Sequence, residues 1–299
     1  MNLISMADLS IADIMDILDK AENMKEKRRH GKTVDLLRNK SLATLFEKPS
    51  TRTRVSFEVA MTDLGGHALC LNWQEIQLGR GESIEDTARV LSSYVNGIMM
   101  RADHSKALKM AKSASVPVIS GLTEVEHPCQ SLADLLTIRE YKGEFSGLKF
   151  GWIGDGNNVC NSSILACALT GMNIVVACPK GYEPNAEIVK KSKSLGGNTK
   201  ITHDPQEAAK NADILYTDVW VSMGDEVQKK NKMHDFKGFQ INADVVKMAK
   251  DDVIVMHCLP AHRGEEIAPD IIDDPHSVIF EQAENRLHAQ KALLVKLLG

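Results

Sequence analysis

The segment Leu42-Ala43-Thr44-Leu45-Phe46-Glu47-Lys48-Pro49-Ser50-Thr51-Arg52-Thr53-Arg54 joins an apolar run to a stretch that favours a helix. We predict a strand over residues 42–46 and a helix through residue 64, because Val55, Val59 and Leu64 fall on one helical face. Ser50 or Thr51 can cap this helix, and its free backbone N–H groups favour an anion. Arg52 and Arg54 add guanidinium groups, which bind phosphate oxygens in pairs. The segment therefore predicts a phosphate site, although a capped surface helix with solvated arginines would contain the same residues.

The composition is that of a soluble globular protein with room for two domains. The chain has 299 residues, of which 43% are hydrophobic and 25% are charged. No run approaches the roughly 18 apolar residues of a membrane helix, and residues 1–8 resemble neither a signal nor a transit peptide, so we expect a cytoplasmic protein without a membrane partner. The net charge of −4 excludes a protein-wide basic field for nucleic acid. The six cysteines form no C-x-x-C pair, so neither a zinc site nor a disulfide framework is expected.

Strand-like and helix-like segments alternate along the chain. The predicted strands cover residues 42–46, 67–71, 97–100, 116–119, 148–153, 174–178, 214–219 and 253–258. The predicted helices cover residues 7–21, 50–64, 83–95, 105–114, 127–141, 160–169, 184–195, 206–211, 243–250 and 284–298. This alternation predicts an α/β fold with two domains, each a parallel sheet covered by helices on both faces. We place the domain boundary between residues 141 and 147.

Two positions at strand ends bear on ligand binding. Arg101 ends the strand over residues 97–100, and ligands of open α/β sheets bind beyond the carboxyl ends of the strands. Gly154-Asp155-Gly156 follows another strand, as in dinucleotide-binding turns, but Val159 stands where the third glycine would be, so a nicotinamide cofactor is not expected.

Two further segments are interpreted as surface structure. Residues 25–30, which are rich in charge, are interpreted as a solvated helix end, and residues 77–82, which are polar and rich in glycine, as a mobile loop.

Three distant segments narrow the interpretation: His127-Pro128-Cys129-Gln130, Asp218-Val219-Trp220-Val221-Ser222-Met223-Gly224, and His257-Cys258-Leu259-Pro260-Ala261-His262-Arg263-Gly264. Together with Ser50 to Arg54 they stand in the same order, at similar separations, as the signature segments of ornithine carbamoyltransferases, which this chain resembles from end to end. Aspartate carbamoyltransferases share the Ser50 to Arg54 segment. The segments around Ser222 and Cys258 resemble the ornithine enzymes specifically.

The resemblance implies a reaction and a division of the chain. The reaction transfers the carbamoyl group of carbamoyl phosphate to the δ-amine of L-ornithine, giving L-citrulline and phosphate, a step of arginine metabolism. Residues 1–141 would bind carbamoyl phosphate, residues 147–283 would bind ornithine, and the helix over residues 284–299 would pack back on the first domain. The active site would lie in the cleft between the domains, and no cofactor is implied.

The resemblance also assigns site residues. The carbamoyl phosphate contacts it implies are Ser50, Thr51, Arg52, Thr53, Gln77, Arg101, His127, Gln130, Cys258, Leu259 and Arg286. The ornithine contacts it implies are Asn158, Asp218, Ser222 and Met223. Among these, Arg101, His127 and Cys258 would be catalytic, the first two as donors to the carbonyl oxygen on which charge develops.

Several alternatives remain beside this interpretation. A thiol between histidines invites a covalent route through Cys258, but direct attack by an amine requires no acyl-enzyme. His257, Cys258 and His262 could be metal ligands, but a zinc site would require more ligands than the sequence offers there, so no metal is expected. The acceptor could be aspartate, putrescine or an N-acylated ornithine, or the protein could bind without turnover. In carbamoyltransferases the loop that matches Gln77 enters the neighbouring subunit's site, which implies a homotrimer.

Overall fold

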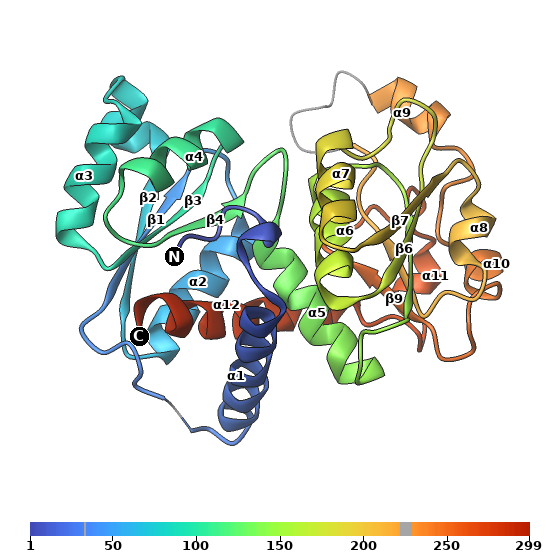
Figure 1. The fold of residues 1–299 in the computed structure, drawn as a ribbon, viewed down its shortest axis with the longest axis horizontal. Coiled ribbons are helices and arrows are strands. Elements are labelled where there is room, and N and C mark those ends of the chain that lie inside the picture. The colour runs from blue at the N-terminus through green and yellow to red at the C-terminus, as the bar shows by residue number, and fades with distance from the viewer. Residues whose placement is uncertain (33, 222–228) are drawn as a thin grey trace. The chain divides into compact units, whose positions relative to one another are not determined.

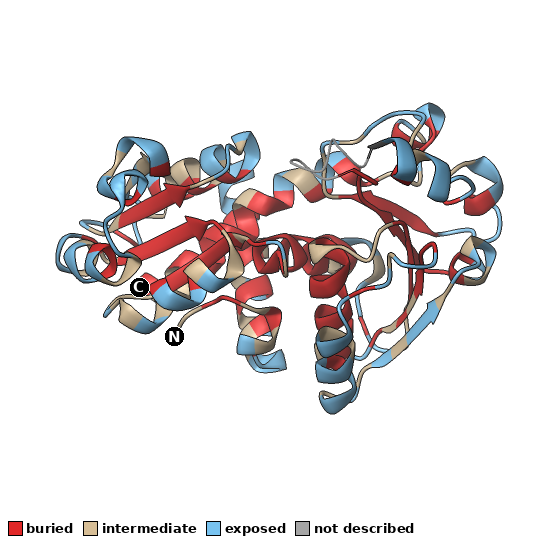
Figure 2. Cartoon of the chain, turned by 90° about the horizontal axis from the view of Figure 1, so that it is seen from above, coloured by how far each residue is buried: buried red, intermediate tan, exposed pale blue. Residues whose placement is uncertain are grey.

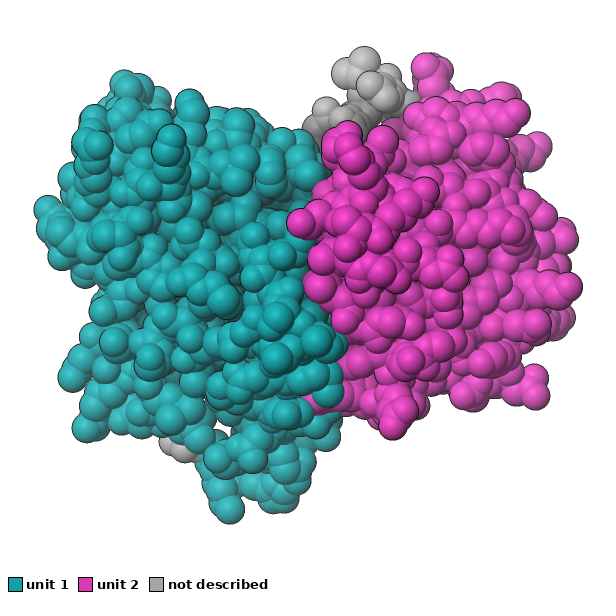
Figure 3. Space-filling model, in the orientation of Figure 1, with its two compact units in different colours: residues 1–136, 284–299 teal, residues 137–283 magenta. Residues whose placement is uncertain are grey.

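The computed structural model describes residues 1–32, 34–221 and 229–299, and these form two compact units. Unit 1 comprises residues 1–136 and 284–299, and unit 2 comprises residues 137–283 (Figure 3). The division falls inside helix α5 (Pro128–Lys142), ahead of the predicted boundary at residues 141–147. Each unit contains one sheet, and within the described ranges no helix has the length and apolarity needed to cross a membrane.

Unit 1 is built on a four-stranded sheet in the order β2-β1-β3-β4, with every neighbouring pair parallel. Its strands are β1 (Ser41–Phe46), β2 (His67–Asn72), β3 (Gly97–Arg101) and β4 (Val118–Leu122). Its helices are α1 (Ile11–Arg29), α2 (Thr51–Asp63), α3 (Ile84–Tyr94), α4 (His104–Ser113) and most of α12 (Ile279–Leu298) (Figure 1). The predicted parallel sheet is confirmed.

Side chains of β3 alternate between two covered faces, as a strand requires. Ile98 and Met100 pack with residues of α3 and α4, including Ala88 and Met110. Gly97 faces the other way, toward α12, since a side-chain atom there would meet Leu298. Arg101 ends the strand, and its guanidinium reaches the start of α2, where it donates to Ser50 and Thr53. The sheet interior is buried on both sides (Figure 2).

The face on which α2 packs differs from the predicted one. Phe57, Ala60 and Met61 are fully buried, whereas Val55 is 51% exposed and Val59 is only partly covered. The prediction from Val55, Val59 and Leu64 was therefore wrong for Val55. The error has a physical cause. The buried face of α2 begins at Thr53, a polar residue that can be buried because its hydroxyl accepts hydrogen bonds from Arg101 and Arg286. A search for apolar residues at helical spacing does not detect such a position.

Two surface interpretations in unit 1 also require correction. Helix α1 runs through Arg29, and Lys25, assigned to a solvated end, is buried with its Nζ donating to Asn285 Oδ1 at 2.7 Å. The segment interpreted as a mobile loop forms a short 3-10 helix, η3 (Gln77–Arg80), which follows η2 (Trp73–Glu75). Leu78 and Trp73 are buried in the core there, so apolar anchors hold the polar segment against the domain.

Unit 2 contains a five-stranded parallel sheet in the order β7-β6-β5-β8-β9. Its strands are β5 (Lys149–Ile153), β6 (Asn173–Ala177), β7 (Asn198–Thr202), β8 (Ile214–Thr217) and β9 (Ile254–His257). Its helices are α6 (Asn158–Thr170), α7 (Ala186–Ser194), α8 (Pro205–Ala209), α9 (Lys229–Asp235), α10 (Ala243–Val246) and α11 (Pro269–Ile272). Three of these elements, β7, α9 and α11, were not predicted from the sequence.

Candidate active site

The N-terminus of α2 is capped as the sequence predicts. Ser50 is the N-cap, and its Oγ accepts a hydrogen bond from Thr53 N at 3.3 Å. Thr51 and Arg52 lie exposed in the first turn, where backbone N–H groups and the positive end of the helix dipole favour an anion. Arg54 does not add to this end, because its Nε donates to Glu58 Oε1 at 3.3 Å on the helix surface.

Two arginines from distant parts of unit 1 converge on the same helix end. Arg101 extends from the last residue of β3, and its Nη1 donates to Ser50 Oγ at 3.1 Å and to Thr53 Oγ1 at 3.4 Å. Arg286 extends from α12, and its Nη2 donates to Thr53 Oγ1 at 3.4 Å. Its Nη1 donates to Gln130 Oε1 at 2.7 Å. The Thr53 hydroxyl therefore accepts hydrogen bonds from two buried guanidinium groups, and the Ser50 hydroxyl accepts one from Arg101.

His127 lies among these charges, at the start of α5. Its imidazole is buried, and burial together with the nearby Arg286, Arg101 and Arg52 guanidinium groups holds the pKa of His127 well below its usual 6.5. The ring is therefore neutral at physiological pH, and it can donate one N–H without carrying charge. Arg101 and Arg286 meet at the Thr53 hydroxyl, and Arg52 lies in the first turn of the same helix, so unit 1 has three arginines at or near the start of α2. This arrangement suits a multiply charged anion.

Gln130 is held from both ends of its amide. Its Nε2 donates to Asp134 Oδ1 at 2.8 Å, and its Oε1 accepts from Arg286. Asp134, which the sequence analysis did not single out, thus orients Gln130 from one turn further along α5; its position four residues after Gln130 is the signal that could have found it. Gln77 is exposed at the start of η3, outside these hydrogen bonds.

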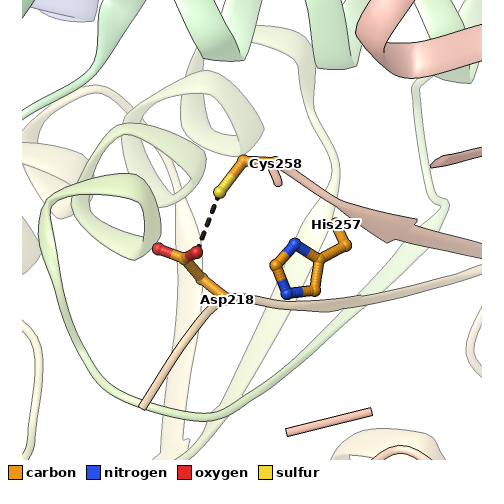
Figure 4. A group of neighbouring side chains, drawn as sticks. All are labelled: Asp218, His257 and Cys258. Atoms are coloured by element: carbon orange, nitrogen blue, oxygen red, sulfur yellow. Dashed lines mark hydrogen bonds between the residues drawn. The ribbon is translucent and has the colours of Figure 1, made fainter. Parts of the chain in front are cut away.

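In unit 2, a second group of predicted residues lies at the carboxyl ends of three neighbouring strands. Asp218 follows β8, and Cys258 follows β9, and the Cys258 thiol donates to Asp218 Oδ1 at 2.9 Å (Figure 4). Asn157, in the turn after β5, donates from Nδ2 to Asp218 Oδ2 at 2.7 Å. Val219 N donates to Asp218 Oδ1 at 2.8 Å. Asp218 is therefore a buried carboxylate with hydrogen bonds to both oxygens.

His257 supports the segment beside this carboxylate. Leu259 N donates to His257 Nδ1 at 2.9 Å, so Nδ1 is an acceptor and the ring hydrogen lies on Nε2. Nε2 is 3.0 Å from Glu266 Oε1, and both side chains are fully buried. Leu259 has a φ of 58°, in the left-handed region, which its hydrogen bond to His257 helps to hold. Glu266 was not predicted; no sequence spacing marks it.

The three residues weighed as metal ligands do not form one group. Asp218, His257 and Cys258 have ligand atoms within 4.8 Å of one another, while His262 belongs to a separate group with Glu265 and Glu266. Both ring nitrogens of His257 are engaged, by Leu259 and Glu266, and the Cys258 thiol is engaged by Asp218. This part of unit 2 is thus arranged as a hydrogen-bond network.

The remaining predicted ornithine contacts are partly described. Asn158 opens α6 half-buried, and its Oδ1 accepts from Val159 N at 3.0 Å. Ser222 and Met223 lie outside the described residues. The structure thus brings Ser50, Thr53, Arg101 and Arg286 together in unit 1, and it brings Asp218 and Cys258 together in unit 2.

Comparisons with known proteins cover the whole chain. Residues 1–140 match the family model "Aspartate/ornithine carbamoyltransferase, carbamoyl-P binding domain", and residues 146–297 match "Aspartate/ornithine carbamoyltransferase, Asp/Orn binding domain". The chain is 58% identical over 299 residues to an ornithine carbamoyltransferase of Archaeoglobus fulgidus, covering 100% of this chain and 97% of that protein. It is 58% identical over 298 residues to one of Methanosarcina mazei, covering 99% of each.

Solved structures agree with these matches. An ornithine carbamoyltransferase from Pyrococcus furiosus superposes with a TM-score of 0.96 at 52% identity, covering 100% of this chain and 97% of that one. An anabolic ornithine carbamoyltransferase from Campylobacter jejuni superposes with a TM-score of 0.93 at 41% identity, covering 99% and 98%.

Proposed function

The chain belongs to the aspartate/ornithine carbamoyltransferase family, and from this premise we propose that it transfers the carbamoyl group of carbamoyl phosphate to the δ-amine of L-ornithine. The products are L-citrulline and phosphate. The observation that carries the proposal is the convergence of Arg101 and Arg286 on the capped N-terminus of α2, beside a neutral His127. Such a site has the charge for a phosphate and an uncharged donor for a carbonyl oxygen.

Carbamoyl phosphate binds to unit 1. Its phosphate takes the N–H groups at the start of α2 with Ser50, Thr51, Arg52 and Thr53. Its carbamoyl group meets Arg101, His127 and Gln130, with Arg286 closing the arginine cluster. Arg286 already donates to Gln130 in the structure. This hydrogen bond orients the Gln130 amide before carbamoyl phosphate binds. Cys258 and Leu259, from unit 2, complete the predicted carbamoyl contacts.

Transfer proceeds by direct attack. The neutral δ-nitrogen forms a bond to the carbonyl carbon, and the electron pair of the C=O bond moves to oxygen. Arg101 and His127 stabilise that oxyanion, since prepositioned donors act where charge develops. The intermediate collapses as the oxyanion re-forms the C=O bond and the carbon–oxygen bond to phosphate breaks. Phosphate leaves with the electron pair of that bond, and the proton that the nitrogen loses passes by way of the Cys258 thiol to the departing phosphate. A neutral His127 can donate to the oxyanion without competing for the phosphate.

Ornithine binds to unit 2. Asp218 receives the α-ammonium, the backbone near Ser222 and Met223 meets the carboxylate, and Cys258 lies beside the δ-amine. Asn158 is a further ornithine contact. The thiol handles the amine proton, and no bond from sulfur to the carbamoyl carbon is needed. The hydrogen bond from Cys258 to Asp218 supports this role, because it links the two residues that would hold the ends of one substrate.

Assembly is part of the same proposal. A homotrimer in which Gln77 reaches the neighbouring subunit's carbamoyl phosphate would explain why an exposed residue is carried on a segment anchored by Trp73 and Leu78. The trimer, the donated Gln77 and a cytoplasmic location stay predictions, as do the domain roles of residues 1–141, 147–283 and 284–299.

The experiment is citrulline formation by the purified protein from carbamoyl phosphate and ornithine. A panel with aspartate, putrescine and N-acetylornithine tests the rival acceptors, and carbamoylation of one of these in preference to ornithine would overturn the substrate assignment. Tight carbamoyl phosphate binding without turnover of any amine would instead identify a binding protein.

A further inference from the structure

We propose that Asn157 is a positioning residue for ornithine: it fixes the Asp218 carboxylate so that one oxygen serves the Cys258 thiol and the other keeps a place for the substrate ammonium. This inference rests on the proposed function and adds a residue to it. The family resemblance implies a role for Asn158 but none for Asn157.

The Asn157 amide is used at both ends. Its Oδ1 accepts from Val159 N at 3.0 Å and from Cys160 N at 3.1 Å, which makes it the N-cap of α6. Its Nδ2 donates to Asp218 Oδ2 at 2.7 Å. Since a carboxylate only accepts and backbone N–H groups only donate, this orientation of the amide is the one that satisfies every partner.

The acceptor positions of Asp218 can be counted. An ionised carboxylate has about four lone-pair positions, two on each oxygen. Oδ1 takes donors from Cys258 and Val219, so it is filled. Among the described residues, Oδ2 takes one donor, Asn157. One position on Oδ2 is thus left for an N–H of the α-ammonium, and Asn157 decides which way that position points.

The turn that carries Asn157 is itself held in place. Gly156 N donates to Tyr182 O at 2.9 Å, and a side-chain carbon on Gly156 would come within 2.3 Å of Pro184 N, so only glycine permits this approach. On the other side, Lys232 Nζ lies 2.7 Å from Asp155 Oδ2, and both side chains are largely buried. Asn157 is therefore presented by a fixed backbone, and its amide can orient a partner with little loss of entropy on binding.

Two substitutions separate orientation from capping. Asn157→Asp and Asn157→Ser both keep a side-chain oxygen that caps helices well, so α6 should remain stable in each. Asn157→Asp replaces the donor by a carboxylate facing Asp218, whereas Asn157→Ser removes the donor without adding charge. Loss of a hydrogen bond to a charged group corresponds to roughly a ten- to hundredfold rise in KM for ornithine, larger for Asn157→Asp. The KM for carbamoyl phosphate should change by less than about twofold, because neither substitution touches the residues proposed to bind that substrate.

The pH dependence gives a readout that a purely structural role would not produce. Two carboxylates within hydrogen-bond distance hold a shared proton more tightly than either alone, and protonation of the carboxylate that Asn157→Asp introduces would restore a donor to Asp218. The ratio of ornithine KM in Asn157→Asp to that in the wild type should therefore fall as pH is lowered from about 8 to about 6. The same ratio for Asn157→Ser should stay flat. The other ionisable groups nearby, Cys258, His257 and the Asp155–Lys232 pair, are common to all three proteins.

Calorimetry with L-norvaline in the presence of carbamoyl phosphate provides the second measurement. This ligand has the ammonium and carboxylate of ornithine but no δ-amine, so it reports on the Asp218 end alone. Weakened binding in both variants, with unchanged melting temperature, supports the role of Asn157. A KM ratio for Asn157→Asp that does not vary with pH, or wild-type affinity for norvaline in that variant, overturns it. If the wild-type protein forms no citrulline, the proposed function fails. If the wild-type protein forms citrulline and the Asn157 variants have the same KM for ornithine, the proposed function stands and the role of Asn157 fails.

Discussion

Arg286 and Gln130 are 156 positions apart in the chain, yet Arg286 Nη1 donates to Gln130 Oε1 at 2.7 Å within unit 1. The contact ties the C-terminal helix to α5 beside His127. The residues of the proposed anion site thus come from the start of α2, the end of β3, the start of α5 and the interior of α12, which supplies Arg286.

Arg52→Ala should weaken carbamoyl phosphate binding by roughly ten- to hundredfold, because a phosphate would lose a charge-assisted, bidentate partner. Ornithine affinity should change far less. Arg54→Ala is the matched control, since Arg54 lies on the same helix but pairs with Glu58. Calorimetry with carbamoyl phosphate measures both, and equal affinities for Arg52→Ala and the wild type would remove α2 from the phosphate site.

Phe57→Ala should lower the free energy of unfolding by about 3–5 kcal/mol, because Phe57 is fully buried under the sheet of unit 1. Val55→Ala, two residues earlier and 51% exposed, should stay within about 0.5 kcal/mol of the wild type. Urea unfolding compares the two. A larger loss in the free energy of unfolding for Val55→Ala than for Phe57→Ala would show that α2 packs through the face that the apolar pattern predicted.

The α2 example shows what a sequence pattern can and cannot supply. Alternating apolar segments predicted the parallel sheets, since a strand buried on both faces must be apolar. Strand β7 was not predicted because it lies at the edge of its sheet. Asn198 and Lys200 are exposed there and Thr199 is only partly buried, so the strand has no apolar pattern. The proposed site residues were assigned through motif resemblance. Asn157 and Glu266 act through hydrogen bonds between segments, which only the folded chain brings together, whereas Asp134 lies four residues after Gln130 in one helix and could have been found from that spacing.

Acid should destabilise the protein through its buried histidines. Burial is the main cause that lowers the pKa of His288 from 6.5 to about 4, with Lys25 and Lys291 adding to the shift against Glu284. Between about pH 6.5 and pH 4, His288 is therefore protonated in the unfolded chain but not in the folded protein. The contribution of neutral His288 to the free energy of unfolding is present above about pH 6.5 and is lost as the pH falls toward 4.

The substitution His288→Asn should flatten this loss by up to about 1.4 kcal/mol per pH unit. Unfolding by urea at pH 7, 6 and 5 measures the slope for each protein. His30→Asn is the control, because the His30 side chain is 63% exposed. An unchanged slope in His288→Asn would mean that other groups, such as the buried His127, account for the acid sensitivity.

Cys258→Ala should lower turnover without abolishing it, because direct attack by the amine needs no bond to sulfur. The Asp218 carboxylate would lose its thiol donor but keep those from Asn157 and Val219. Mass spectrometry of the wild-type protein quenched during turnover provides the complementary measurement. A carbamoyl-cysteine at Cys258, together with complete inactivity of Cys258→Ala, would establish the covalent route instead.

Gln77 is exposed on a segment that Trp73 and Leu78 anchor to unit 1. If Gln77 serves a neighbouring subunit, each site draws on two chains, and contacts that run one way around a ring suit a closed trimer. Gln77→Ala and Arg52→Ala subunits should each be nearly inactive alone. Mixed trimers should recover part of the activity, because some interfaces then pair an intact Gln77 with an intact Arg52.

The mixing experiment needs subunit exchange, which native mass spectrometry can follow through the masses of the mixed assemblies. Mixing either variant with itself under the same conditions sets the background. Random assortment of the two variants should place both intact residues at a substantial fraction of interfaces, so recovery should rise with the proportion of mixed trimers. Activity equal to the sum of the parents, in a sample where mixed trimers are abundant, would place Gln77 outside the neighbour's site and leave each subunit with a site of its own.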